Sequence, residues 1–244
     1  MNEKTGIFLQ ARLDSNRLPE KALLNLGGIT IVEHAMRSLS SIDADHYVLL
    51  TDERSSNRLR PLARLCDFEL FVGDPDDVLD RFYRASQRYG VDTVVRATGD
   101  NPLVSAEATE LTLRLRREKE ADFAALDKLP LGTGVEVVRS QALYVAWKRA
   151  SRPYDREHVT PFVYRNPHRF RIARIAAPEA LQSPEARVTL DTWEDYRHLQ
   201  GLVEDLHYSF PVTIRDIIWW YQGYFLRVVR TERVGARRRP SFSR

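Results

Sequence analysis

The stretch IFLQARLDSNRLPEKALLNLGG, residues 7–28, opens with a short apolar run and continues into a polar loop before any helical periodicity begins. An apolar run of this length predicts a strand that is buried on both faces of a sheet. The loop that follows carries three cationic side chains, those of Arg12, Arg17 and Lys21. The sequence therefore gathers three positive charges at the point where a buried strand leaves its sheet.

Similar apolar runs recur through the chain, and segments with helical periodicity separate them. This alternation predicts an α/β fold with a mostly parallel sheet and right-handed crossovers. Ser105 and Ser140 are predicted helix caps, and Thr192 with Asp195 forms a capping-box pattern. The predicted strands are 6–10, 47–51, 68–72, 93–97, 122–126, 134–139, 169–176 and 186–190. The predicted helices are 31–42, 59–66, 78–89, 105–120, 140–150, 196–206 and 213–225.

The composition is ordinary for a soluble globular protein, with 43% hydrophobic residues. No apolar run is long enough for a membrane span, and the first ten residues lack the apolar stretch of a signal peptide. The one cysteine, Cys66, excludes an internal disulfide. We therefore expect a cytoplasmic protein with no membrane span.

The basic character of the chain belongs to its last twenty residues. Seven arginines and one acid lie from Phe225 onward, and 30 basic and 33 acidic residues precede them. We expect one domain, residues 1–225, followed by an Arg-rich and disordered tail, residues 226–244. A solvated tail is favoured over one that binds nucleic acid or an anionic membrane, so nucleic acid is not an expected partner.

The three cations near the start suit an anionic ligand. In open α/β sheets, ligands bind outside the carboxyl ends of the strands, and residues 10–21 leave the first predicted strand at that edge. Three cations in a loop that leads into a helix can hold several phosphates. The loop matches neither the Walker pattern nor the Rossmann fingerprint. The alternative is a solvated basic turn.

Two aspartates stand at the ends of other predicted strands. Asp100 lies in VVRATGDNPL, residues 94–103, and Asp191 lies in ARVTLDTWEDY, residues 186–196. Mg²⁺ favours one or two protein carboxylates together with phosphate oxygens. If the two aspartates meet across one cleft, they complete a set of groups suited to phosphoryl or nucleotidyl transfer. The alternatives are a bare turn at Asp100 and a helix-cap region at Asp191.

Five segments together carry a family resemblance. QARLDSNRLPEKALLNLGG (10–28) resembles the opening of the SpsF-type cytidylyltransferases, which are similar to the synthases of CMP-3-deoxy-manno-octulosonate and CMP-sialic acid. The order and spacing of the segments resemble this family from about residue 5 to 220. The four others are GDPDDVLDRFYRAS (73–86), VVRATGDNPL (94–103), REHVTPFVYRNP (156–167) and VTLDTWEDY (188–196).

The resemblance implies a three-layer, Rossmann-like nucleotide-diphospho-sugar transferase fold. It also implies transfer of CMP from CTP to a sugar, sugar acid or related small acceptor, with release of pyrophosphate, for surface polysaccharide or natural-product synthesis. Mg²⁺ is the implied cofactor, and a homodimer is the implied assembly.

The resemblance also implies roles for individual residues. Arg12, Arg17 and Lys21 would hold the triphosphate, with Arg12 and Lys21 neutralising charge that develops during transfer, and Asp100 and Asp191 would hold Mg²⁺. Gln10 and Ala11 would lie beside the nucleotide. Asp76, Asp77 and Arg81 would border the base, although Asp77 is equally a candidate helix cap. Glu136, Arg156 and His158 would line the acceptor side.

The chain departs from the family pattern at several positions. Asp14 and Glu20 stand where glycine is usual, and an acid inside a phosphate loop repels the ligand unless it faces away or meets a cation. Asn16, Gly134 and Trp193 are further departures. They indicate an unusual acceptor. The alternative is a catalytically impaired nucleotide-binding protein with a regulatory role.

Overall fold

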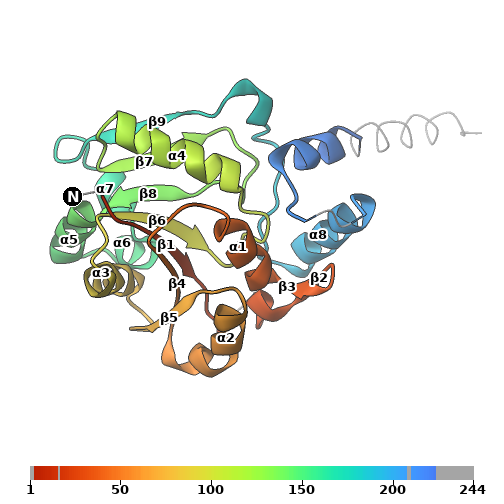
Figure 1. Cartoon of the computed structure of the whole chain (residues 1–244), viewed down its shortest axis with the longest axis horizontal. Coiled ribbons are helices and arrows are strands. Elements are labelled where there is room, and N and C mark those ends of the chain that lie inside the picture. Colours follow the sequence, from red (N-terminus) through yellow and green to blue (C-terminus); the bar gives the residue numbers. More distant parts are fainter. Residues whose placement is uncertain (1–2, 16, 208–209, 224–244) are drawn as a thin grey trace, which may run out of the picture.

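The computed structural model describes residues 3–15, 17–207 and 210–223. A seven-stranded sheet lies at its centre, in the order β5-β4-β1-β6-β8-β7-β9 (Figure 1). Strands β5, β4, β1 and β6 are parallel, β8 is antiparallel to β6 and β7, and β9 is parallel to β7. The strands are β1 (Thr5–Gln10), β4 (His46–Thr51), β5 (Glu69–Val72), β6 (Thr93–Thr98), β7 (Phe123–Asp127), β8 (Glu136–Arg139) and β9 (Ile172–Ala176).

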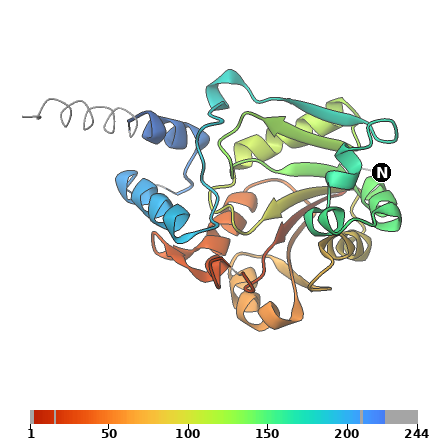
Figure 2. The same ribbon diagram turned by 180° about the vertical axis from the view of Figure 1, so that it is seen from behind.

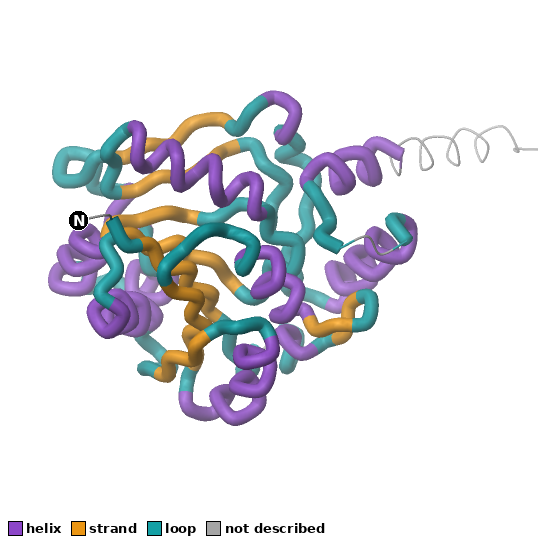
Figure 3. Tube along the Cα trace, in the orientation of Figure 1, coloured by secondary structure: helices purple, strands orange, loops and turns teal. Residues whose placement is uncertain are grey.

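Helices cover both faces of this sheet, so the molecule has three layers (Figures 1 and 2). The tube in Figure 3 shows the strands enclosed between the helices. The predicted α/β architecture with a mostly parallel sheet is therefore confirmed. One face carries α1 (Ile31–Leu39), α2 (Glu53–Leu65) and α4 (Ala106–Glu118), and the other carries α3 (Val78–Tyr89), α5 (Ser140–Arg149), α6 (Pro153–His158) and α7 (Pro161–Tyr164).

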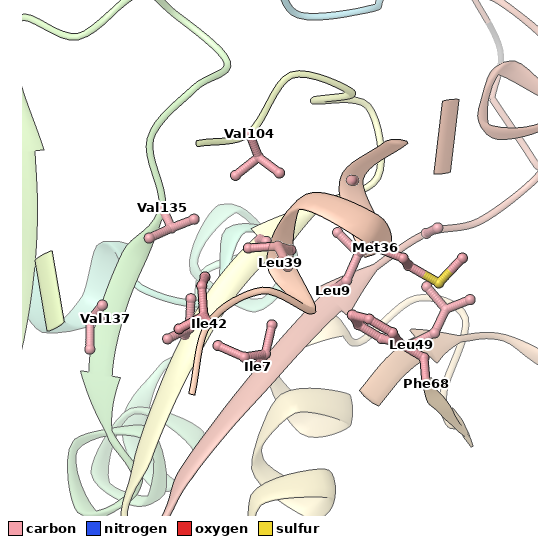
Figure 4. Close-up of a cluster of buried hydrophobic side chains, with 14 of the residues drawn as sticks. Ile7, Leu9, Met36, Leu39, Ile42, Leu49, Phe68, Val104, Val135 and Val137 are labelled. Atoms are coloured by element: carbon pink, nitrogen blue, oxygen red, sulfur yellow. The ribbon is translucent and has the colours of Figure 1, made fainter. Parts of the chain in front are cut away.

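The first strand shows how the sequence builds these layers. Ile7 and Leu9 point into the core beneath α1 and α2 (Figure 4), whereas Phe8 points into the core beneath α3 and α5. All three side chains are fully buried. The period-two alternation of a strand accordingly supplies apolar side chains to both cores, as a central parallel strand requires.

A third apolar cluster lies beyond the sheet and joins segments distant in sequence. Helix α8 (Trp193–Asp205) and a helical segment at 214–223 pack there against Val188 and Leu190. The predicted tail at 226–244 lies outside the described residues. Among the described helices, none is both long and apolar enough to cross a membrane. The remaining elements are η1 (Lys21–Leu23), β2 (Asn25–Leu26), β3 (Ile29–Thr30) and η2 (Glu179–Leu181).

Two of the three predicted caps are confirmed. The Ser105 hydroxyl accepts a hydrogen bond from the Ala108 N–H, and Thr192 and Asp195 form both bonds of a capping box. The prediction for Ser140 is wrong, because this residue is already helical and its hydroxyl donates to the Val91 carbonyl at 2.5 Å. The Ser140 hydroxyl therefore binds a carbonyl that is distant in sequence and does not cap its own helix.

The predicted strand at 186–190 is also wrong. This segment is extended and its alternate side chains are buried, but it forms only one isolated bridge, between Arg187 and Leu131. The Leu131 N–H donates to the Ala186 carbonyl and the Val188 N–H donates to the Leu131 carbonyl, each at 2.8 Å. An alternating pattern predicts an extended backbone, but a strand also needs a neighbour, which is a long-range property.

Candidate active site

The three motifs that the sequence separates meet in one pocket of about 340 Å³. The pocket lies at the carboxyl ends of β1 and β6, where the cationic loop and the turn after Thr98 leave the sheet. This is the edge at which parallel α/β sheets bind ligands. Its walls include Gln10, Ala11, Arg12, Ser15, Arg17, Lys21, Arg96, Thr98, Gly99, Asp100, Glu157, His158 and Asp191.

Lys21 lies at the centre of this site. Its Nζ is 3.0 Å from Asp100 Oδ2 and 3.1 Å from Asp191 Oδ1, and it donates to the Leu190 carbonyl at 2.7 Å. The Lys21 side chain is only 15% exposed. The two aspartates are therefore brought together as the sequence predicted, and their negative charges converge on one compact cation.

Two arginines complete the charge pattern around Asp191. Arg17 donates to Asp191 Oδ1 at 2.9 Å, and Arg187 donates to Asp191 Oδ2 at 3.0 Å. Arg12 is exposed and lines the same pocket. Since Arg17 and Arg12 both keep solvent access, they can contact an incoming anion.

The arrangement of Asp100 and Asp191 fits a divalent cation. Asp100 Oδ2 and Asp191 Oδ1 lie 3.0 and 3.1 Å from Lys21 Nζ, so both carboxylates already face one positive charge, and a divalent cation held by both would take a place beside this ammonium group or replace it. No cluster of three or more His, Cys, Asp or Glu side chains suited to a metal ion occurs among the described residues. Two carboxylates leave coordination positions for phosphate oxygens and water, as Mg²⁺ commonly requires.

Asp195 holds the backbone at Asp191 in place. Asp195 Oδ2 accepts hydrogen bonds from the N–H groups of Asp191 and Thr192, both at 2.9 Å. Burial by itself raises the pKa of the Asp195 carboxyl, but these hydrogen bonds and the Arg187 charge bring its pKa below the ordinary value. The carboxylate therefore stays charged at neutral pH and keeps its hydrogen bonds to the N–H groups of Asp191 and Thr192.

Gly99 is required by a close approach of two chain segments. Its N–H donates to the Gln10 carbonyl at 2.7 Å, and an added Cβ would lie 2.8 Å from the Ala11 Cβ. The Asp100 carbonyl in turn accepts from the Leu190 N–H at 2.8 Å. The glycine thus lets the Asp100 turn fit between the end of β1 and the segment that carries Asp191.

Asp77 and Arg81 have structural partners. Asp77 caps α3 by accepting from the Asp80 N–H at 2.9 Å, and it also accepts from Arg156. Arg81 is fully buried, and its guanidinium donates to the Asp74 carbonyl at 2.8 Å. Burial is the main cause that lowers the pKa of Arg81 from its ordinary value. Arg81 therefore supports the loop between β5 and α3 from behind, whereas Asp77 ends that loop as the cap of α3.

That loop forms one wall of a second pocket of about 560 Å³, and Arg12 lines both pockets. Asp76 and Asp77 line the second pocket, whereas Arg81 lies behind the wall. The residues predicted to border the base therefore lie next to the charged site, and Arg12 links the two.

The predicted acceptor residues are spread over both pockets. His158 lines the charged site, while Arg156 lies in the second pocket and binds Asp77. Glu136 accepts from Arg96 at 2.9 Å and from Thr160 at 2.7 Å, so it lies behind Arg96. His158 therefore lines the charged site itself, whereas Glu136 contacts the site only by binding Arg96.

Sequence reasoning missed Arg96 and Thr98, which line the site from β6. A signal was available, because residues 96 and 98 alternate along the strand and so share one face, and Asp100 follows in the turn directly after that strand. Glu157, the third missed residue of this kind, follows Arg156 on α6 and is exposed at the pocket. No sequence pattern marks Glu157 as a residue of the site.

The two acids that depart from the family pattern in the cationic loop both face α2. Asp14 forms an ion pair with Arg54 at 3.2 Å, and Glu20 forms one with Arg58. The two arginines lie one helical turn apart, so a single face of α2 receives both acids. Neither acid lines the charged pocket. The loop therefore presents its cations to the pocket and its acids to the helix. Asn16 lies outside the described residues.

Glu20 also occupies a backbone conformation that normally selects glycine, with φ 54° and ψ 24°. We predict that Glu20→Gly melts about 2–4 °C higher than Glu20→Ala, because alanine keeps the left-handed strain and glycine removes it. Both variants lose the Arg58 ion pair, so the comparison isolates the backbone effect. Thermal unfolding followed by circular dichroism measures the difference. An alanine variant as stable as the glycine variant would contradict it.

Comparisons with known proteins agree with this geometry. A family model described as cytidylyltransferase matches residues 7–222. The spore coat polysaccharide biosynthesis protein SpsF of Bacillus subtilis is 31% identical over 220 residues, which cover 86% of this chain and 91% of that protein. The 3-deoxy-manno-octulosonate cytidylyltransferase of Chromohalobacter salexigens is 32% identical over 168 residues, 62% of this chain and 63% of that protein.

A solved structure of a cytidylyltransferase from Leptospira borgpetersenii superimposes with a TM-score of 0.81 at 25% sequence identity. The match covers 99% of this chain and 100% of that one. The likeness therefore extends over the whole architecture, including the segments that converge on Lys21.

Proposed function

Because the chain belongs to the cytidylyltransferase family, we propose that it transfers CMP from CTP to a sugar, sugar acid or related small acceptor, with release of pyrophosphate and with Mg²⁺ as its metal ion. Two relatives, a polysaccharide biosynthesis protein and a 3-deoxy-manno-octulosonate cytidylyltransferase, support this acceptor class. The homodimer and the cytoplasmic location stay predictions.

One observation carries the proposal: Lys21 lies between Asp100 and Asp191 in a pocket that Arg12 and Arg17 also line. Three cations and two carboxylates at one sheet edge form a site that can hold a triphosphate and a divalent cation together. A site built only for structural ion pairs would not need an open pocket beside them.

The reaction assigns a role to each charged group. An acceptor oxygen attacks the α-phosphorus of CTP, the new P–O bond forms as the bond to the β-phosphate oxygen breaks, and the hydroxyl proton leaves to solvent or a nearby base. Arg12 and Arg17 hold the phosphates, and Lys21 neutralises charge that develops on them. Mg²⁺, when held by Asp100 and Asp191, supplies further charge neutralisation to the phosphate oxygens.

The second pocket suits the nucleoside part of the substrate. Arg12 joins it to the charged site, so a ligand whose phosphates contact Arg12 can extend into either pocket. We assign the base to the wall formed by the loop at 74–77 and the acceptor to the side of His158. Arg96 then faces the acceptor, and Glu136 holds Arg96 from behind.

The rival hypothesis is a nucleotide-binding protein that has lost turnover through its loop substitutions. The positions of Asp14 and Glu20 weaken its main support, because both acids pair with arginines of α2 and neither lines the charged pocket. An active enzyme is thus the better account of these substitutions.

A thermal-shift screen tests nucleotide preference first. With Mg²⁺ present, CTP at about 100 times its dissociation constant should stabilise the fold by about 2.7 kcal/mol, which raises the melting temperature by about 5–10 °C. ATP, GTP and UTP should give smaller shifts. A larger shift with another nucleotide would contradict the assignment of CTP.

Pyrophosphate release with a panel of sugars and sugar acids then separates the two hypotheses. Turnover with one acceptor class supports the enzyme. Binding of CTP without release across the whole panel would favour the impaired binding protein.

A further inference from the structure

The segment 186–191 carries Asp191 into the site without the support of a neighbouring strand. Its bridge to Leu131 uses the carbonyl of Ala186 and the N–H of Val188. In an extended backbone, the N–H and carbonyl of the residue between them, Arg187, point to the opposite side. A second strand would normally bind these two groups.

A single side chain takes the place of that strand. The Tyr221 hydroxyl accepts from the Arg187 N–H at 3.0 Å and donates to the Arg187 carbonyl at 2.6 Å. Tyr221 lies in the helical segment 214–223, which follows α8 and precedes the grey trace in Figure 1. The C-terminal helical segment therefore clamps the backbone of Arg187 from the side that lacks a strand.

His198 of α8 fixes the clamp. Its Nε2 lies 2.5 Å from the Tyr221 oxygen. Since the only hydroxyl hydrogen goes to the Arg187 carbonyl, His198 is inferred to donate from Nε2. Burial lowers the pKa of His198 below its ordinary value, which favours the neutral ring. The neutral ring that carries its proton on Nε2 can donate this hydrogen bond to the Tyr221 oxygen. Tyr221 is thus held in one orientation between α8 and residue 187.

The clamped residue connects directly to the charged site. The Arg187 side chain donates to Asp191 Oδ2 at 3.0 Å, and its Nε lies 3.5 Å from Asp195 Oδ1. Three residues further on, the Leu190 carbonyl accepts from Lys21 Nζ. A shift of the backbone at Arg187 would therefore move both the carboxylate and the carbonyl that surround Lys21.

We propose that Tyr221 is a positioning residue for the metal-holding carboxylate Asp191, acting through the backbone of Arg187. The inference rests on the proposed function of the site. It makes the helical segment 214–223 part of the catalytic structure, although no residue of that segment lines the charged pocket.

The variant Tyr221→Phe isolates the hydroxyl. The helical segment is anchored independently, because Ile217 and Trp220 are buried and the Trp220 Nε1 donates to Asp205 at 2.9 Å. The Arg187 hydrogen bonds are at the exposed surface, so water can replace the lost partner without unfolding the segment. The matched control is Tyr47→Phe, which removes a hydroxyl that donates to the Ile42 carbonyl, away from the charged pocket.

Binding of Mn²⁺, followed by electron paramagnetic resonance in the presence of CTP, gives a readout that does not depend on turnover. We expect Tyr221→Phe to raise the Mn²⁺ dissociation constant about tenfold, on the scale of losses from partners that orient metal ligands. In steady-state kinetics, kcat should fall while KM for CTP changes little, because Arg12 and Arg17 hold the phosphates. Tyr47→Phe should match the wild type in both measurements.

The outcomes separate this inference from the proposed function. If Asp191→Asn abolishes Mn²⁺ binding but Tyr221→Phe binds like the wild type, the positioning role is overturned and the proposed function stands. If the wild type binds no Mn²⁺ with or without CTP, both are overturned. Hydrogen exchange of the wild type adds a check that needs no variant: a slow Arg187 amide supports the clamp, and an unprotected one overturns it.

Discussion

Replacement of Lys21 by methionine should lower kcat for CMP transfer by about 10²–10³-fold. In the part of the chain that the structure describes, the Lys21 ammonium is the charged group that pairs with both Asp100 and Asp191, and its side chain is largely buried. Removing a buried charge that stabilises developing negative charge costs a factor of this order. Methionine keeps the unbranched apolar stem, so the packing around residue 21 should survive. Pyrophosphate release under saturating CTP and acceptor measures the loss.

The same variant should still bind a divalent cation. Without Lys21, the carboxylates of Asp100 and Asp191 face each other with no cation between them, and their repulsion favours any ion that enters. Retained Mn²⁺ binding with lost turnover would therefore assign Lys21 to the phosphates. Lys119→Met, on the exposed end of α4, is the matched control and should behave as the wild type. Wild-type turnover by Lys21→Met would remove this residue from the mechanism.

Replacement of Asp100 by asparagine should also lower turnover by about 10²–10³-fold. Asparagine preserves size and one oxygen but removes the charge that holds a divalent cation. The backbone should be unaffected, because it is the main-chain carbonyl of Asp100 that binds the Leu190 N–H. We expect the Mg²⁺-dependent part of the thermal shift with CTP to disappear, while a metal-independent shift from Arg12 and Arg17 persists.

Asp127→Asn is the matched control for this charge removal. Asp127 is likewise a strand-end aspartate, at the end of β7, but its carboxylate pairs with Arg174 and lies outside the charged pocket. It should leave turnover and the metal-dependent shift unchanged. Equal turnover in Asp100→Asn and Asp127→Asn would show that Asp100 holds no essential metal ion.

Much of this site followed from short-range pattern. An apolar run before a cationic loop located Lys21, and the end of β6 located Asp100. Because parallel strands present their carboxyl ends at one edge, the meeting of these two residues was predictable without coordinates. Asp191 reaches the same edge from the extended segment 186–190, which is not a strand of the sheet, so the strand rule does not explain its position. The pattern of β6 also contained Arg96 and Thr98, which share one face of the strand that leads into the Asp100 turn.

Other parts of the site were not predictable from local pattern. Arg81 sits inside the protein behind the loop it supports, although its motif suggested contact with a ligand. The acids Asp14 and Glu20 would repel a phosphate if they faced it, but they pair with Arg54 and Arg58 of α2, which no local pattern predicts. Ser140 likewise followed a cap pattern but bonds a distant carbonyl.

The sequence by itself determined the alternation of strands and helices, the two-sided burial of β1 and the edge of the sheet that carries the charged residues. Each of these depends on periodicity within about ten residues, which the chain encodes locally. The tertiary structure alone decided which polar groups pair across the fold, including the Tyr221 hydroxyl that replaces a strand beside Arg187. Pairing of that kind joins residues distant in sequence, and only the packing of whole elements brings them within hydrogen-bonding distance.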